Sequence, residues 1–179
     1  MIPTIETPRL QLRAFSEEGD AAFVLRVLNE PSFYEFIGDR GIRSLDAARR
    51  YLSEGPIESY RQHGHGLMWL GIRTSSGRLI AAGMCGLVRR PSLDHPDIGF
   101  ALLPEHWGQG YVTEAANAVL VRAQAELALG EVYGVTLAHN RRSIRVLEKL
   151  GLRFQTQRSL TEGAPALCIY HRLLVASES

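Results

Sequence analysis

The chain has 179 residues, of which 45% are hydrophobic and 22% are charged, and its formal net charge is +1. This composition predicts one globular domain with a substantial core and argues against a disordered chain. A net charge so close to zero argues against nucleic acid or an acidic membrane as a partner. The sequence shows no secretory signal, and its longest apolar run (79–88) is too short to span a bilayer, so we expect a cytoplasmic protein.

The first third of the chain predicts one strand followed by two helices. Its apolar residues first alternate and then recur at helical spacing, and a serine stands at each expected helix N-cap. The expected elements are a strand at 9–15, a helix at 16–29 and a helix at 44–64 that is broken near Gly55-Pro56. We expect the segment between the helices, residues 30–43, to be a loop.

From residue 67 onward the apolar period changes to two, which indicates strands. The expected elements are strands 67–74, 79–88 and 96–103, helix 109–129, strand 131–138, helix 140–151 and a closing hairpin of 152–160 and 164–174. Only the crossover through helix 109–129 must join parallel strands. The order predicts an α/β (α+β) fold with a mixed, mostly antiparallel sheet of about seven strands and about four flanking helices.

Two glycines stand at the mouth of the predicted helix 109–129, in the segment "WGQGYVT" (107–113). A helix N-terminus leaves backbone N–H groups unpaired, and glycine lets a phosphate come close to them. The segment therefore suits an anion, and a pyrophosphate in particular. An ordinary strand–helix turn is an equally good interpretation of the segment taken alone. A Walker loop is excluded because no lysine follows, and a dinucleotide fingerprint needs a third glycine where Thr113 stands.

Two motifs at fixed spacing narrow this choice. "PEHWGQGYVTEA" is followed about thirty residues later by "NRRSIRVLEKLGL", and the chain opens with "ETPRLQLRAF". Together they resemble the GCN5-related N-acetyltransferase (GNAT) superfamily, and within it the bacterial RimJ/RimL-type branch, named for acetylation of ribosomal-protein N-termini. The resemblance covers residues 7–173, and we expect a single domain over 1–179.

The resemblance implies acetyl-coenzyme A as co-substrate, in a sheet splayed between its fourth and fifth strands, 98–103 and 132–138. The pantetheine would lie in that gap and pair with the backbone of Leu102 and Leu103, and Asn140 would bond to it. Ser143 would form a hydrogen bond with the leaving thiolate. Asn140 and Ser143 also suit an ordinary helix cap and a first-turn residue. The pyrophosphate would lie on the amides of Gly108, Gln109, Gly110, Tyr111, Val112 and Thr113.

Acetyl transfer to an amine also needs a general base and a donor for the developing oxyanion. Backbone N–H groups within 100–103 are candidates for the oxyanion. Asp97 or Glu105 could remove the amine proton through water, although each could equally be a solvated carboxylate at a strand end. Gln155 stands where relatives carry a second glutamate, and it cannot accept a proton.

We therefore expect transfer of an acetyl group from acetyl-coenzyme A to a primary amine, on a protein N-terminus or a small molecule, by direct attack in a ternary complex. The segment 30–43 and the helix after it are expected to wall the acceptor side. Two alternatives stay open: a catalytically weak acyl-coenzyme A sensor or interaction module, and a nucleotide-binding domain without acyl chemistry. We expect no metal, because His63 and His65 lack a third ligand, and either a monomer or a homodimer.

Overall fold

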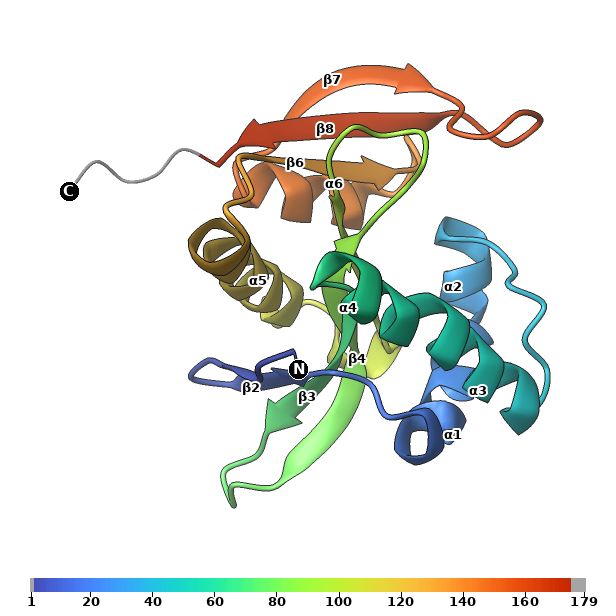
Figure 1. The fold of residues 1–179 in the computed structure, drawn as a ribbon, viewed down its shortest axis with the longest axis vertical. Helices are drawn as coiled ribbons and strands as arrows, with labels where there is room; N and C mark the ends of the chain where they lie inside the picture. Colours follow the sequence, from blue (N-terminus) through green and yellow to red (C-terminus); the bar gives the residue numbers. More distant parts are fainter. Residues whose placement is uncertain (1, 175–179) are drawn as a thin grey trace.

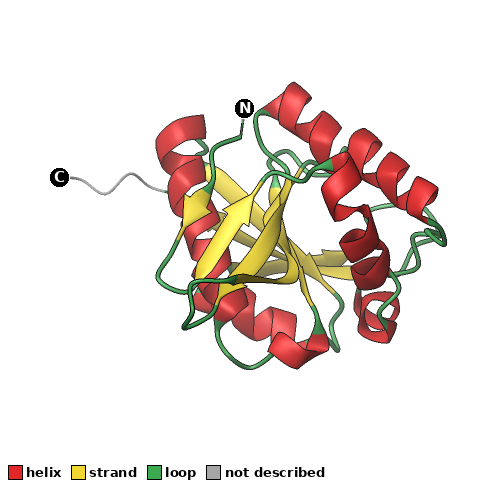
Figure 2. Cartoon of the chain, turned by 90° about the horizontal axis from the view of Figure 1, so that it is seen from below, coloured by secondary structure: helices red, strands yellow, loops and turns green. Residues whose placement is uncertain are grey.

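The computed structural model describes residues 2–174 and shows one eight-stranded sheet with helices on both of its faces (Figures 1 and 2). The strands are β1 (Ile5–Glu6), β2 (Leu10–Arg13), β3 (Leu67–Arg73), β4 (Leu79–Val88), β5 (Asp97–Leu102), β6 (Glu131–Thr136), β7 (Arg153–Arg158) and β8 (Leu167–Leu173). The helices are α1 (Glu17–Leu28), α2 (Pro31–Phe36), α3 (Leu45–Leu52), α4 (Glu58–His63), α5 (Tyr111–Leu127) and α6 (Arg141–Lys149). Within residues 2–174, no helix has the length and apolarity that crossing a bilayer requires.

The strands lie in the order β1-β2-β3-β4-β5-β6-β8-β7, and every neighbouring pair is antiparallel except β5 and β6. The predicted mixed sheet with one parallel crossover is therefore confirmed. The sequence analysis did not predict β1, because a strand of two residues is too short to show an alternating pattern.

The segment 30–43, predicted as a loop, contains the short helix α2. Pro31 is the first residue of α2, a position where the missing N–H of proline costs no hydrogen bond. This proline therefore follows the end of α1 and also begins α2. The predicted helix 44–64 is present as α3 and α4, joined by a π-helical turn at Ser53–Ile57. The turn contains Pro56, whose lack of an N–H explains the irregular hydrogen bonding.

Two hydrophobic cores lie on opposite faces of the sheet. One contains Leu120 of α5 and Leu147 of α6, and the other contains Val24 of α1 and Leu52 of α3. In Figure 1, α5 lies on one side of β4, while α2 and α3 lie on the other. The helices thus form two layers, and the sheet between them carries the strands of the candidate site.

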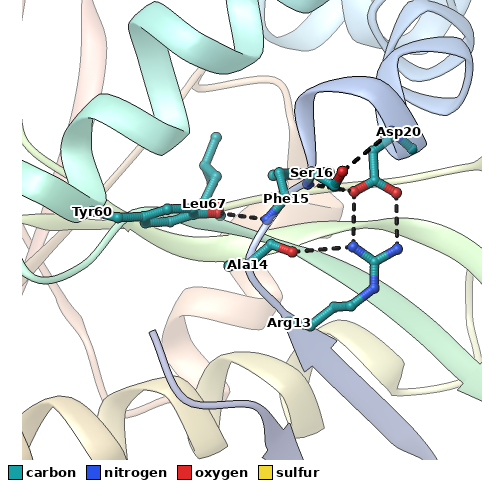
Figure 3. A network of polar contacts seen from close by, with 8 residues as sticks. Arg13, Ala14, Phe15, Ser16, Asp20, Tyr60 and Leu67 are labelled. Atoms are coloured by element: carbon teal, nitrogen blue, oxygen red, sulfur yellow. Dashed lines mark hydrogen bonds and ion pairs between the residues drawn. The ribbon is translucent and has the colours of Figure 1, made fainter. Parts of the chain in front are cut away.

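A network of polar contacts ties α1 and α4 to the sheet (Figure 3). Arg13 of β2 makes two hydrogen bonds of 2.8 Å to the carboxylate of Asp20, which is only 3% exposed. Tyr60 of α4 accepts a hydrogen bond of 3.1 Å from the Phe15 N–H and donates one to the Leu67 carbonyl. Because these contacts hold both helices against β2 and β3, they fix one wall of the cavity described below.

Candidate active site

The parallel strands β5 and β6 separate almost as soon as they meet. Their only paired residues are Asp97 and Tyr133, and the Tyr133 N–H donates to the Pro96 carbonyl at 2.9 Å. Beyond that point β5 continues to Leu102 paired with β4 alone. The predicted splay between these two strands is therefore confirmed, and it opens a cavity of about 980 Å³.

The backbone of β5 presents hydrogen-bonding groups to this gap. The Leu103 N–H donates to the Ala82 carbonyl at 2.9 Å, and the ladder between β4 and β5 is regular. Because backbone groups alternate in direction along an antiparallel ladder, those of Phe100 and Leu102 face away from β4. The Leu102 carbonyl accepts a hydrogen bond of 2.8 Å from the Trp107 indole. The Leu102 N–H and both backbone groups of Phe100 are therefore turned toward the gap.

Leu103 does not fit the role that the resemblance implied for it. Its N–H is used by β4, and its carbonyl accepts from the His106 N–H at 3.0 Å. The chain turns at Pro104 into a short 3-10 helix, Pro104–His106, and a hydrogen bond of this helix occupies the Leu103 carbonyl. The Leu103 backbone is therefore occupied within the fold, while its buried side chain contributes to the cavity wall.

The glycine turn leads from the end of β5 into α5. Gly108 and Gly110 have φ angles of +76° and +79°, a region that residues with a Cβ enter only with strain. The first backbone hydrogen bond of the helix runs from the Glu114 N–H to the Gly110 carbonyl at 3.1 Å, and no side chain caps the helix. The N–H groups of residues 111–113 are thus without helical acceptors, and these three residues line the cavity.

Gln109 differs from its neighbours in the turn. It does not line the cavity, whereas Gly108 and Gly110 do. Its carbonyl accepts a hydrogen bond of 2.9 Å from Arg9, which comes from the opening motif of the chain. The glycine turn therefore has one side toward the cavity and the other toward the residues just before β2.

Asn140 and Ser143 lie together at the start of α6, and both line the cavity. The Asn140 side-chain oxygen accepts a hydrogen bond of 3.1 Å from the Ser143 N–H, which is the ordinary cap contact. Asn140 is 8% exposed. Since the cap uses only the oxygen of Asn140 and the backbone of Ser143, the Asn140 amide nitrogen and the Ser143 hydroxyl are free to meet a ligand.

The two candidate bases occupy different environments. Asp97 lines the cavity, is 1% exposed and forms an ion pair of 2.7 Å with Arg90. Burial raises the pKa of Asp97 above its usual range, against the lowering effect of Arg90. Glu105 lies outside the cavity lining, with its side chain 47% exposed and paired with Arg26 at 2.5 Å. A hydrogen bond from its own backbone, and then Arg26, lower the pKa of Glu105.

Three cations of α6 face the cavity: Arg142, Arg145 and Lys149. The Arg142 guanidinium lies 4.6 Å from the centre of the Trp107 ring. Their spacing of i, i+3 and i+7 along one helix was a signal available in the sequence, and the sequence analysis did not use it. Arg141 does not line the cavity.

Another part of the cavity wall is formed by α2, α3 and the turn before α4. It carries the aromatic rings of Phe33, Phe36 and Tyr51 and the carboxylates of Glu30 and Glu54. Residues of the segment 30–43 thus line the cavity, and its expected place on the acceptor side stays a prediction. Among residues 2–174, no group of three or more histidine, cysteine, aspartate and glutamate side chains is placed to hold a metal ion.

A splayed parallel strand pair, with a glycine turn and an uncapped helix beside it, is the arrangement that the resemblance to acetyl-coenzyme A-dependent acetyltransferases implied, and its unpaired N–H groups suit an anion. Residues 9–153 match the family described as "Acetyltransferase (GNAT) domain", and the chain therefore belongs to the GNAT acetyltransferases. Its reaction is acetyl transfer from acetyl-coenzyme A.

Individual relatives agree with this assignment. The N-acetyltransferase YoaA of Bacillus subtilis is 25% identical over 154 residues, covering 86% of this chain and 84% of the relative. An acetyltransferase from Agrobacterium tumefaciens has a TM-score of 0.77 at 23% identity, with 96% of this chain and 95% of that chain covered. RimL in complex with coenzyme A has a TM-score of 0.80 at 14% identity, with 96% and 98% covered, which shows a shared fold.

Proposed function

We propose that the protein transfers the acetyl group to a primary amine, on a protein N-terminus or a small molecule, by direct attack in a ternary complex. The observation that carries this proposal is the single paired position between β5 and β6, beyond which the cavity opens. The lining of that cavity includes the glycine turn and the cations of α6, and also the rings and carboxylates of α2, α3 and the residues flanking them. The first set suits the donor and the second suits the acceptor, and the two would meet at the splayed strands.

The donor would bind beside the glycine turn and the cations of α6. The N–H groups of residues 111–113 and the positive end of the α5 dipole suit its pyrophosphate. The amide groups of its pantetheine arm would pair with the free backbone groups of Phe100 and Leu102, much as an added strand would. Asn140 offers a further amide to the same arm.

The chemistry then requires two proton movements. Asp97, through a water molecule, would take a proton from the acceptor ammonium, because it lines the cavity and its raised pKa suits a group that must gain a proton. The amine nitrogen forms a bond to the thioester carbonyl carbon, and a β5 backbone N–H stabilises the oxyanion. The carbon–sulfur bond then breaks while the nitrogen loses its second proton. The Ser143 hydroxyl donates a hydrogen bond to the departing thiolate, which takes up that second proton and leaves as coenzyme A.

The part of the cavity lining proposed for the acceptor favours an amine carried by a larger molecule. The carboxylates of Glu30 and Glu54 suit a cation, and the rings of Phe33, Phe36 and Tyr51 offer apolar contact to the neighbouring groups. RimL is described as a ribosomal L7/L12 alpha-N-protein acetyltransferase, and a peptide N-terminus meets these requirements here as well.

Titration calorimetry and a thiol-release assay test the proposal together. We expect acetyl-coenzyme A to bind at sub-millimolar concentration, and coenzyme A to be released in the presence of an amine from a panel of N-terminal peptides, polyamines and amino-sugars. Binding without release for any acceptor would instead support the acyl-coenzyme A sensor. Competition by ATP or NAD, with no binding of coenzyme A, would support a nucleotide-binding domain.

A further inference from the structure

The opening motif "ETPRL" contacts the glycine turn through two side chains. Thr7 and Arg9, just before β2, both reach Glu114 in the first turn of α5, more than a hundred positions away in the sequence. The Thr7 hydroxyl donates to one carboxylate oxygen at 2.6 Å, and Arg9 Nε and Nη2 each lie 2.7 Å from the other. Because both oxygens are held, the position of Glu114 is fixed relative to the sheet.

Arg9 also contacts the turn itself, on both sides of Gly110. Its Nη1 donates to the Gln109 carbonyl at 2.9 Å, and its guanidinium carbon lies 4.7 Å from the centre of the Tyr111 ring. One planar group thus touches positions 109, 111 and 114. A glycine turn loses much conformational freedom when it becomes ordered, and contacts made before a ligand arrives remove that cost from binding.

The contact with Gln109 fixes the direction of one particular N–H group. The Gln109 carbonyl and the Gly110 N–H belong to the same peptide unit, and a trans peptide points the two groups in opposite directions. While Arg9 holds the carbonyl, the N–H of Gly110 is turned away from Arg9. A rotated peptide would present its carbonyl in place of this N–H and repel an anion.

Arg9 also compensates a charge that would oppose the ligand. Glu114 is a carboxylate in the first turn of α5, where it would repel a nearby pyrophosphate. Burial alone would raise the pKa of Glu114, but the hydrogen bonds from Thr7 and Arg9 outweigh it and lower the pKa, so the carboxylate stays ionised. Arg9 therefore balances a permanent negative charge beside the site.

We infer that Arg9, with Thr7 and Glu114, is a positioning residue for the acetyl-coenzyme A site: it presets the glycine turn for the pyrophosphate and neutralises Glu114. This inference rests on the proposed place of the pyrophosphate at the amides after Gly108. Arg9 touches the turn and does not line the cavity, so it would act through the turn and not on the reacting atoms.

Calorimetry with acetyl-coenzyme A tests the inference on a set of variants. We expect Arg9→Ala to raise Kd about tenfold and Arg9→Lys, which keeps the charge but not the forked contact, to raise it less. Because Arg9→Ala leaves the Glu114 charge uncompensated, the double variant Arg9→Ala/Glu114→Gln should bind more tightly than Arg9→Ala alone. Arg73→Ala is the matched control, since it removes an exposed ion pair with Glu6 of β1 and leaves the glycine turn untouched.

Kinetics separate this role from a general loss of structure. With Arg9→Ala, KM for acetyl-coenzyme A should rise while kcat and KM for the acceptor stay near wild type. KM for acetyl-pantetheine, a donor without the pyrophosphate, should not change. Thermal unfolding of each variant monitors the fold, and if Arg9→Ala does not fold, Arg9→Lys and Glu114→Gln carry the same comparison.

The outcomes distinguish the inference from the function beneath it. Wild-type protein that does not bind acetyl-coenzyme A would contradict the proposed function. Two results would overturn the positioning role alone. One is a Kd for acetyl-coenzyme A in folded Arg9→Ala that stays within twofold of the wild-type Kd. The other is a KM for acetyl-pantetheine that rises in Arg9→Ala as much as the KM for acetyl-coenzyme A.

Discussion

Asp97 and Arg90 form an ion pair of 2.7 Å at the position where β5 and β6 part. The Asp97 carboxylate is almost fully buried, and both residues line the cavity. The pair therefore joins the loop that follows β4 to the start of β5, and it brings a carboxylate with a raised pKa to the point where β5 and β6 separate. Its structural and chemical roles can be separated by mutation.

The first prediction compares the two candidate bases. Asp97→Asn should lower kcat about a hundredfold, because the isosteric amide cannot accept a proton. Glu105→Gln should change kcat less than twofold, since Glu105 lies outside the cavity. The measurement is steady-state kcat at saturating donor and acceptor, with acetyl-coenzyme A affinity as a check on the site.

Loss of the ion pair must be distinguished from loss of the base. Asp97→Asn leaves Arg90 without its carboxylate and should destabilise the fold by about 3 kcal/mol. Arg90→Gln breaks the same pair but retains the carboxylate, so it should keep far more turnover than Asp97→Asn. Equal turnover in these two variants would mean that Asp97 serves only the fold.

The second prediction concerns the leaving thiolate. Ser143→Ala removes only the hydroxyl, and the Asn140 cap survives because it is made to the backbone N–H. We expect kcat to fall about tenfold while Kd for acetyl-coenzyme A stays within twofold, since the hydroxyl would act on a charge that develops only during the reaction. An unchanged kcat would remove Ser143 from the mechanism.

Much of the fold was predictable because its signals are local. The serine caps of α1 and α3 accept N–H groups at 3.2 Å as expected, and the apolar stripe of α5 is buried at Ala115, Ala116, Val119, Leu120 and Ala123. Helix α2 was missed because six residues give too little periodicity to read.

The candidate site was less predictable, because its details depend on contacts between distant segments. Spacing and family resemblance found the residues of the glycine turn and the start of α6. Neither could show that hydrogen bonds with Ala82 and His106 occupy the backbone groups of Leu103. The pairing of Glu105 with Arg26 spans 79 positions and was equally invisible in the sequence.

The third prediction tests the network that holds α4. Tyr60→Phe leaves the Phe15 N–H and the Leu67 carbonyl without their partner, which should cost about 2 kcal/mol in the free energy of unfolding. Burial raises the pKa of Tyr60 from 10.0 to about 12. Ionisation therefore favours the unfolded chain between these values, so this contribution is full below pH 10 and is lost as the pH rises through 12.

Urea unfolding at pH 8 and pH 11.5 measures both effects of Tyr60. The stability advantage of wild type over Tyr60→Phe should be complete at the lower pH and smaller at the higher one. An advantage that is the same at both would contradict the raised pKa.

The last prediction uses two glycines with the same backbone conformation. Gly110 in the glycine turn and Gly77 in the turn between β3 and β4 have φ angles of +79° and +80°. A Cβ at Gly110 would meet only Arg9 Nη2 at 3.5 Å, and one at Gly77 would meet nothing within 4 Å, so alanine adds strain without a clash at either site. Each substitution should cost about 1 kcal/mol of stability.

The two variants should differ in binding. Gly110→Ala relieves its strain by turning the peptide units whose N–H groups face the pyrophosphate, so Kd for acetyl-coenzyme A should rise about tenfold. Gly77→Ala has the same strain far from the donor and should keep the wild-type Kd. If the two variants unfold at the same temperature but differ in Kd, the loss of acetyl-coenzyme A binding comes from the glycine turn. Equal Kd values in the two variants would mean that the pyrophosphate binds elsewhere.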